Sequence, residues 1–219
     1  MQKIAAVSLK VLLLVCALFS VSFFTKVAIK EHTLHRVTDV LDELKDNPQT
    51  NSRRQKRELI LKAIDDIESA PKTVVSLPRS YALKAKLYHL LSKVEVWPDK
   101  RNQYLKNAIY NNHNAININH YDVQYWLFDL QVQNEINAGQ PEFFWSLANA
   151  LTLNKWNHEA LSFMSFYCVL QWQKLPSNLK PLCSNTFKNV WEDEVRKQKL
   201  TTQLRGIYRF EDVIQEMIQ

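Results

Sequence analysis

The sequence predicts an all-α protein in which one apolar N-terminal helix precedes a domain of helical hairpins. The segment from Val11 to Phe24 contains no charged residue, and the longer segment that begins at Ile4 contains one charged residue, Lys10. Strand-like alternation is absent, and apolar residues recur at helical spacing along the rest of the chain. We therefore expect a membrane anchor over 1–30, an amphipathic stalk and hinge over 31–52, and an all-α repeat-like soluble domain over 53–219.

The apolar N-terminal segment is long enough to cross a bilayer. A helix over residues 4–24 would span roughly 30 Å, which is the thickness of the hydrocarbon core. A cleaved signal peptide is the alternative, but apolar residues continue through Phe24 without a clear cleavage site. A lipoprotein is disfavoured because Val15 precedes Cys16. The short head before the span resembles that of signal anchors, which implies a single-pass protein whose C-terminal domain lies outside the cytoplasm.

The segment after the predicted anchor has an apolar seam at coiled-coil spacing. The seam covers barely three heptads before Asp46-Asn47-Pro48 ends the helix. It either packs against the chain's own domain or forms a membrane-proximal homodimer contact. Its members are Val27, Leu34, Val37, Leu41 and Leu44.

The formal net charge of +6 does not indicate a nucleic-acid partner once the charges are located. Four of the 28 Lys and Arg residues precede Glu31, which leaves 24 basic against 22 acidic residues from there on. A nucleic-acid surface usually shows a basic stripe with interleaved aromatics. The dense basic run is Arg53, Arg54, Lys56 and Arg57, which is either a solvated first helical turn or a contact with lipid headgroups.

The sequence contains no pattern that points to a cofactor, a metal or a catalytic residue. Phosphate-cradling loops and dinucleotide-binding turns need glycines, and the chain has only Gly139 and Gly206. His32 and His35 lie one helical turn apart but have no third metal ligand within sequence reach. We therefore expect a non-catalytic protein without a cofactor.

Successive helices account for the rest of the chain. Asp99 and Asp122 are expected as N-caps, and Pro141 as the first residue of its helix. The short connections are typical of stacked helical hairpins. The expected helices cover 53–69, 79–94, 100–114, 123–137, 141–153, 158–173, 182–198 and 208–218.

Two cysteines remain outside the apolar segment. Cys168 and Cys183 flank a predicted turn at Leu175–Pro176–Ser177. On adjacent antiparallel helices they could form one disulfide, which would fit an oxidising compartment. The alternative is that they are two small buried apolar residues.

A degenerate repeat relates residues 115–122 to residues 150–157. Ala-Ile-Asn-Ile-Asn-His-Tyr-Asp aligns with Ala-Leu-Thr-Leu-Asn-Lys-Trp-Asn, 35 residues apart. In both, an aromatic residue precedes an Asp or Asn N-cap: Tyr121 and Asp122 in the first, Trp156 and Asn157 in the second. The aromatic is expected to be buried where one helical pair packs on the next. This junction resembles that between tetratricopeptide-type repeats, whose period is about 34 residues, which implies a solenoid with a concave protein-binding surface.

The layout and the turn Asn-Lys-Trp-Asn-His-Glu-Ala (154–160) are similar to the VpsP-type proteins of bacterial exopolysaccharide gene clusters. This resemblance implies a membrane-anchored accessory factor or scaffold that binds a protein partner in polysaccharide biosynthesis or export. A glycan-binding module and an enzyme with an unrecognised active site are the alternatives. The candidate binding surface, if these aromatics are not core, is Tyr81, Tyr88, Tyr104, Tyr125 and Trp126.

Overall fold

The computed structural model describes residues 22, 25, 28, 31–44, 52–153, 158–207 and 210–218. Residues 31–44 are helical, and ten further α-helices and one short 3-10 helix follow within the described residues. The α-helices are α2 (Arg53–Glu68), α3 (Lys72–Val75), α4 (Pro78–Val94), α5 (Pro98–Ile118), α6 (Val123–Ile136), α7 (Pro141–Leu153), α8 (His158–Leu170), α9 (Lys180–Trp191), α10 (Glu194–Leu204) and α11 (Phe210–Ile218). The 3-10 helix, η1, covers Trp172–Lys174.

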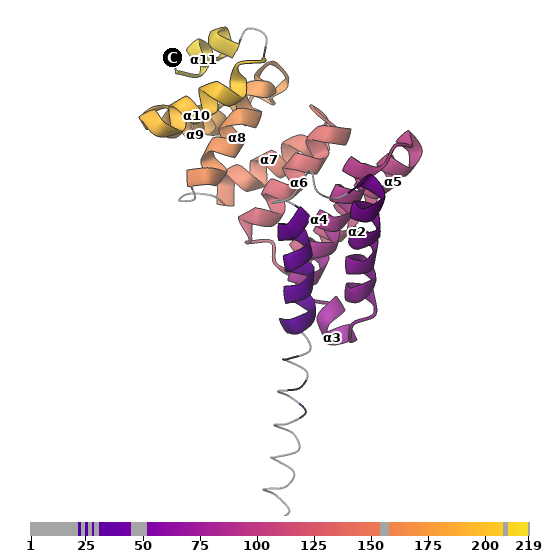
Figure 1. The fold of residues 1–219 in the computed structure, drawn as a ribbon. Coiled ribbons are helices and arrows are strands. Elements are labelled where there is room, and N and C mark those ends of the chain that lie inside the picture. The colour runs from indigo at the N-terminus through magenta and orange to yellow at the C-terminus, as the bar shows by residue number, and fades with distance from the viewer. Residues whose placement is uncertain are drawn as a thin grey trace, which may run out of the picture.

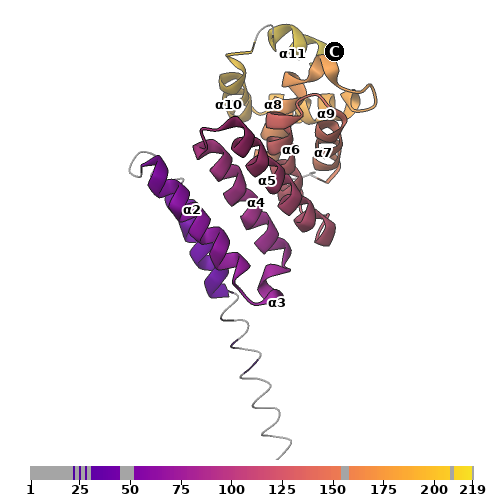
Figure 2. The same ribbon diagram turned by 90° about the vertical axis from the view of Figure 1, so that its right-hand side faces the viewer.

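The helices stack as successive antiparallel pairs. Residues 31–44 pair with α2, and α4 with α5, α6 with α7 and α8 with α9 follow in chain order (Figure 1). The short helices α10 and α11 lie on the last pair at the C-terminal end. After a turn of 90° the pairs again lie side by side, with α3 at the lower end of the first layer (Figure 2). The chain therefore builds one layer at a time.

The predicted stalk belongs to the first layer of the domain. Leu34 and Val37 are fully buried in one apolar cluster with residues of α2, α3 and α4. Arg36 also pairs with Asp66 of α2 across a distance of 2.9 Å. The apolar seam is thus covered within the chain, so residues 31–44 are no separate stalk. This is the first of the two alternatives that the sequence left open, packing against the chain's own domain.

The remaining helices share a larger core that a small cluster joins to the first. This core runs from the end of α5 to α11 and includes Phe143, Leu147 and Phe187, all fully buried. Leu105 and Ala108 of α5 and Val132 of α6 form the joining cluster. The two large cores therefore meet where α4 and α5 pack on α6.

Several helix boundaries differ from those expected, each for a local reason. Trp97, not Asp99, is the N-cap of α5, because Pro98 can occupy the first helical position and starts the helix earlier. The expected helix 182–198 is broken because Asp193 accepts the backbone N–H of Arg196 and caps a new helix, α10. One helical turn, α3, also forms within the loop expected at 70–78.

The aromatic residue expected to fill the first repeat junction does not do so. Tyr121 is 74% exposed, which corrects the prediction that it is buried there. Trp126, one turn into α6, is 3% exposed, and its indole N–H donates to the backbone carbonyl of His120. Asp122 is the N-cap of α6 and accepts the N–H of Gln124 at 3.0 Å. The equivalent residues 156 and 157 lie outside the described part of the chain.

The described residues contain no helix that is both long enough and apolar enough to cross a membrane. The expected span over 4–24 lies outside those residues except for Ser22.

Candidate functional site

A groove opens on the face formed by the first helix of each of three successive pairs. It has a volume of about 280 Å³ and is lined by α4, α6 and α8. Phe128 and Phe163 supply apolar surface, and Lys86 and Gln131 supply polar groups. The lining also includes Gln124, Leu127, Glu159 and Ala160.

A second hollow continues along the same series of first helices. It lies between residues 31–38 and α4, where Glu31, His32, His35 and Thr38 face Arg79. Burial raises the pKa of Tyr125 on α6. The charge of Asp122 raises this pKa further, and the charge of Arg79 lowers it. Arg79 of α4 therefore lines this hollow and is close enough to α6 for its charge to act on Tyr125.

The five aromatics proposed from the sequence do not line the groove. Trp126 is core, as described above, and Tyr81 and Tyr125 are half-buried. Tyr88 stacks on Tyr104 with ring centroids 6.4 Å apart, between the two helices of one pair. Phe128 and Phe163, which do line it, were not among the residues proposed from the sequence.

Two carboxylates on α6, the half-buried Glu135 and the buried Asp129, hold this helix against its neighbours. Glu135 lies 2.7 Å from Nε2 of His89 and 2.6 Å from Nζ of Lys93, both on α4. Arg101 of α5 is 3.8 Å from the same carboxylate. One side chain of α6 therefore meets both helices of the preceding pair.

The second carboxylate, Asp129, is completely buried. Its Oδ2 accepts the hydroxyl of Ser146 on α7 at 2.5 Å, and its Oδ1 accepts the amide of Asn112 on α5 at 3.3 Å. Nε2 of His113 lies 3.1 Å from Oδ1. The carboxylate stands between Ser146 and His113, so this histidine cannot take a proton from this serine. The cluster joins α5, α6 and α7 rather than activating a nucleophile.

The two histidines titrate in opposite directions because their surroundings differ. The interaction of His113 with Asp129 raises the pKa of the imidazole and outweighs burial, which lowers it. Burial lowers the pKa of His89 and outweighs the hydrogen bond and charge of Glu135.

Burial, with a smaller contribution from Glu135, raises the pKa of Tyr167 to about 12. Glu135 keeps a lowered pKa because Lys93 and His89 offset the effect of its burial.

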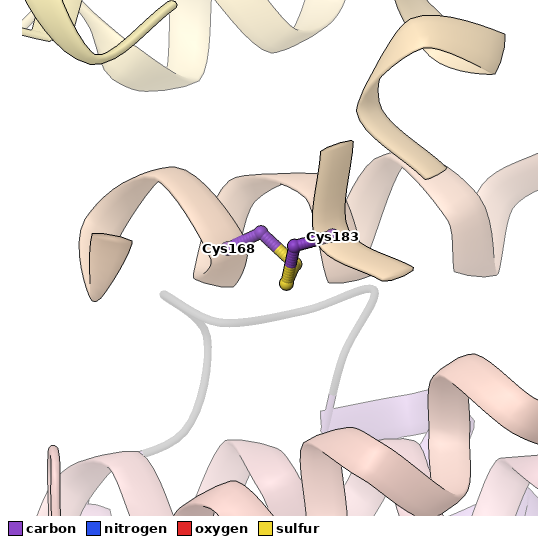
Figure 3. The surroundings of a disulfide bond; sticks show 2 residues. All are labelled: Cys168 and Cys183. Carbon is purple, nitrogen blue, oxygen red and sulfur yellow. A yellow bond between two sulfur atoms is a disulfide. The ribbon is translucent and has the colours of Figure 1, made fainter. Parts of the chain in front are cut away.

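Cys168 and Cys183 form a disulfide between α8 and α9 (Figure 3). Their Cα atoms are 5.6 Å apart, and both side chains are fully buried in the larger core. The bond therefore links the two helices of the fourth pair from inside.

The basic run lies at the end of the first layer opposite to residue 31. Arg36 pairs with Asp66 near the end of α2, so α2 runs antiparallel to residues 31–44 and its first turn lies at the other end. Nε of Arg53 donates to the carbonyl of Val94, and Arg54 pairs with Glu58 at 2.9 Å. Lys56 and Arg57 share this first stretch of α2. The expected contact of these residues with lipid headgroups stays a prediction.

Within the described residues, no group of three or more His, Cys, Asp and Glu side chains is placed to hold a metal ion. His35 instead lies 2.9 Å from Asp39, one turn further along the same helix.

Comparison with known proteins shows the fold. No protein-family model and no curated protein sequence matches the chain. The crystal structure of a thermophilic tetratricopeptide (TPR) protein in Thermus thermophilus is similar to it. The two are 16% identical, the match covers 81% of this chain and 88% of that chain, and the TM-score is 0.51. The chain therefore has a tetratricopeptide-like, all-α fold.

Proposed function

We propose that this protein is a non-catalytic scaffold that binds a protein partner in the groove between α4, α6 and α8. The observation that supports this is the origin of the groove, since three successive pairs each contribute their first helix to one face. Stacked helical pairs present an extended surface of this kind, which can hold a partner segment along its length.

The lining of the groove favours a segment with both apolar and hydrogen-bonding groups. Phe128 and Phe163 offer partly exposed rings, which can cover apolar side chains of a partner. Gln124 and Gln131 lie seven residues apart on α6, so their amides can donate to and accept from a bound backbone. Lys86 adds a positive charge at the α4 side.

Site-specific photo-crosslinking in the native host tests this proposal. A crosslinker at Gln131 should capture a partner, and Lys86→Glu together with Phe163→Ala should abolish the capture. The control places the crosslinker at Gln103, an exposed residue of α5 that does not line the groove. Capture from both positions, or capture that survives the groove substitutions, would contradict a partner bound in the groove.

We further propose that the chain is held in a bacterial inner membrane by residues 4–24, with the helical domain in the periplasm. The apolar length of that segment supports the anchor, and the buried disulfide supports an oxidising compartment. Full-length protein should then stay in washed membranes at unchanged mass, and a reporter fused after Gln219 should be active only outside the cytoplasm. A soluble, shortened chain would contradict the anchor.

The partner that we propose is a component of an envelope polysaccharide synthesis or export machine. The support is the resemblance in layout and in the turn at 154–160 to VpsP-type proteins. Mass spectrometry of the protein crosslinked at Gln131 tests this: a glycosyltransferase, polymerase or export component is the expected result. Direct glycan binding is less well supported, because no Tyr or Trp is among the residues that line the groove.

A further inference from the structure

The connection between α4 and α5 carries two large apolar side chains that the fold does not use. Val96 is 64% exposed and Trp97 is 66% exposed. Neither belongs to any of the three apolar clusters of the described residues. Two such neighbours at a helix-to-helix connection expose apolar surface at a projecting point of the molecule.

Three local features hold the backbone of this connection in place. The Glu95 carboxylate accepts the backbone N–H groups of Val96 and Trp97 at 2.9 and 3.2 Å. Arg53 of α2 donates to the carbonyl of Val94, and Pro98 begins α5 directly after Trp97. The two apolar side chains are therefore held outside by an ordered backbone, which lowers the entropy lost when they bind.

Basic residues surround the connection. Backbone hydrogen bonding by Trp97 is the main cause of the lowered pKa of Glu95, and the charges of Lys100 and Arg57 contribute, which places both cations nearby. The first turns of α2 and the segment from 93 to 101 together carry seven basic residues. The acidic residues set against them are Glu58, which pairs with Arg54, Glu135, which pairs with Lys93, and Glu95 and Asp99. Basic residues therefore outnumber acidic ones within this set, and Glu95 is turned into the backbone.

We propose that this tip, formed by Val96 and Trp97 with Arg57 and Lys100, binds an anionic lipid surface. An exposed apolar pair can be buried either in a matching pocket of a partner or in the interface of a bilayer. The bilayer interface accepts an indole ring without a preformed pocket. Long basic side chains around it can reach the anionic headgroups while their stems cover apolar surface. A nucleic-acid site would instead need a basic stripe with interleaved aromatics.

None of the four residues of the tip lines the groove, so the two surfaces are distinct. The tip lies at the end of the first layer where α2 begins and α4 ends, whereas α3 and residue 31 lie at the opposite end. A bilayer bound there would differ from the one that the proposed anchor would cross. The inference therefore does not rest on the proposed partner of the groove.

Quenching of tryptophan fluorescence by brominated lipid tests the proposal on the full chain. The protein is first reconstituted into phosphatidylcholine vesicles, and a second set of vesicles that contain brominated phosphatidylglycerol is then added. We expect quenching that Trp97→Phe removes and that high salt reduces. Trp145→Phe is the matched control, because Trp145 is 53% exposed on α7, away from the tip. Because only the second vesicles contain the quencher, quenching of Trp97 can be measured both for chains inserted in the first vesicles and for chains free in solution.

The charge requirement has its own matched pair of variants. Arg57→Ala with Lys100→Ala should weaken the apparent affinity about fivefold for each cation removed. Lys72→Ala with Lys199→Ala removes two exposed cations elsewhere and should leave the affinity unchanged. Equal quenching by brominated phosphatidylcholine, equal quenching in the Trp97→Phe variant, or no quenching at all would overturn the proposal. Binding of polyglutamate that depends on Trp97, without binding of vesicles, would also overturn it in favour of an acidic protein.

Discussion

At the scale of single residues, α6 is fixed by polar groups as well as by apolar packing. Asp129 has no exposed surface, so its charge must be balanced by donors inside the protein. Asn112, His113 and Ser146 provide them from α5 and α7. Because an unpaired buried charge is costly, this set of contacts selects one register of α6 between its neighbours.

The first residue-scale prediction concerns the pH dependence of His113. Its folded-state pKa is raised, so its stabilising contribution is complete below the unfolded value of about 6.5 and is lost as pH rises through the folded pKa. The difference in free energy of unfolding between the parent and His113→Gln should therefore shrink as pH rises across that range. Urea unfolding at several pH values measures it.

His89 provides the control with the opposite sign. Its folded pKa is lowered, chiefly by burial, so its contribution is complete above about pH 6.5 and is lost as pH falls through the folded pKa. The difference between the parent and His89→Gln should then shrink as pH falls. The same pH trend for both variants would contradict the opposite surroundings that the structure gives them.

The second residue-scale prediction separates the two aromatics of the first repeat junction. Trp126→Ala should cost about 3–5 kcal/mol, because it empties a buried site and removes the donor to the His120 carbonyl. Tyr121→Ala should change the free energy of unfolding by no more than about 0.5 kcal/mol, because its ring is exposed. Thermal unfolding of both variants decides this. A large loss from Tyr121→Ala would restore the junction that the repeat alignment predicted.

At the scale of helices, the sequence predicted most elements because their signals are local. Asp122 and Pro141 mark helix starts through capping and backbone geometry that the residue itself determines. The break at Asp193 was missed because Glu192 and Glu194 on either side resemble a solvated helical face, and the cap depends on the N–H of Arg196. The sequence left two alternatives for the seam of residues 31–44 because it fits a partner chain and an intramolecular neighbour equally well, and the structure shows the intramolecular one.

The residues that line the groove were harder to predict from the sequence than the helices were. Tyr88 and Tyr104 have the same helical spacing as a surface stripe, but they stack on each other inside a pair. Which face of a helix becomes the outer face depends on how pairs pack, and this is a long-range property. The sequence could therefore indicate the class of surface but not the residues that line it.

The element-scale prediction concerns the bond between α8 and α9. Cys168 and Cys183 are 15 residues apart, and a closed loop of that length stabilises by about 3 kcal/mol through the reduced entropy of the unfolded chain. Reduction should lower the free energy of unfolding of the parent by about this amount. The Cys168→Ala/Cys183→Ala variant should not respond to reductant. Two freely alkylated thiols in freshly prepared native protein would contradict the bond and remove its support for an oxidising compartment.

At the scale of the whole molecule, stability is divided between two cores and the contacts that join them. In stacked repeats each unit contacts mainly its neighbours, so cooperativity depends on the interfaces between units. Here the joint consists of the small apolar cluster around Leu105 and Val132, the charged contacts of Glu135 and the contacts of Asp129 with Asn112 and His113. It is small relative to the cores on either side, so it is the place where the molecule should separate first.

Leu105→Ala should therefore uncouple the two halves of the protein. The side chain is buried, and its truncation should cost about 2–5 kcal/mol at the joint. Five of the six tryptophans follow residue 125, so tryptophan fluorescence reports on the C-terminal half, whereas far-ultraviolet circular dichroism reports on all helices. The two thermal transitions should coincide in the parent and separate in Leu105→Ala. Leu147→Ala, buried well inside the larger core, is the control for a similar loss of packing away from the joint. Coincident transitions in Leu105→Ala, or an equal separation in Leu147→Ala, would show that cooperativity does not depend on this joint.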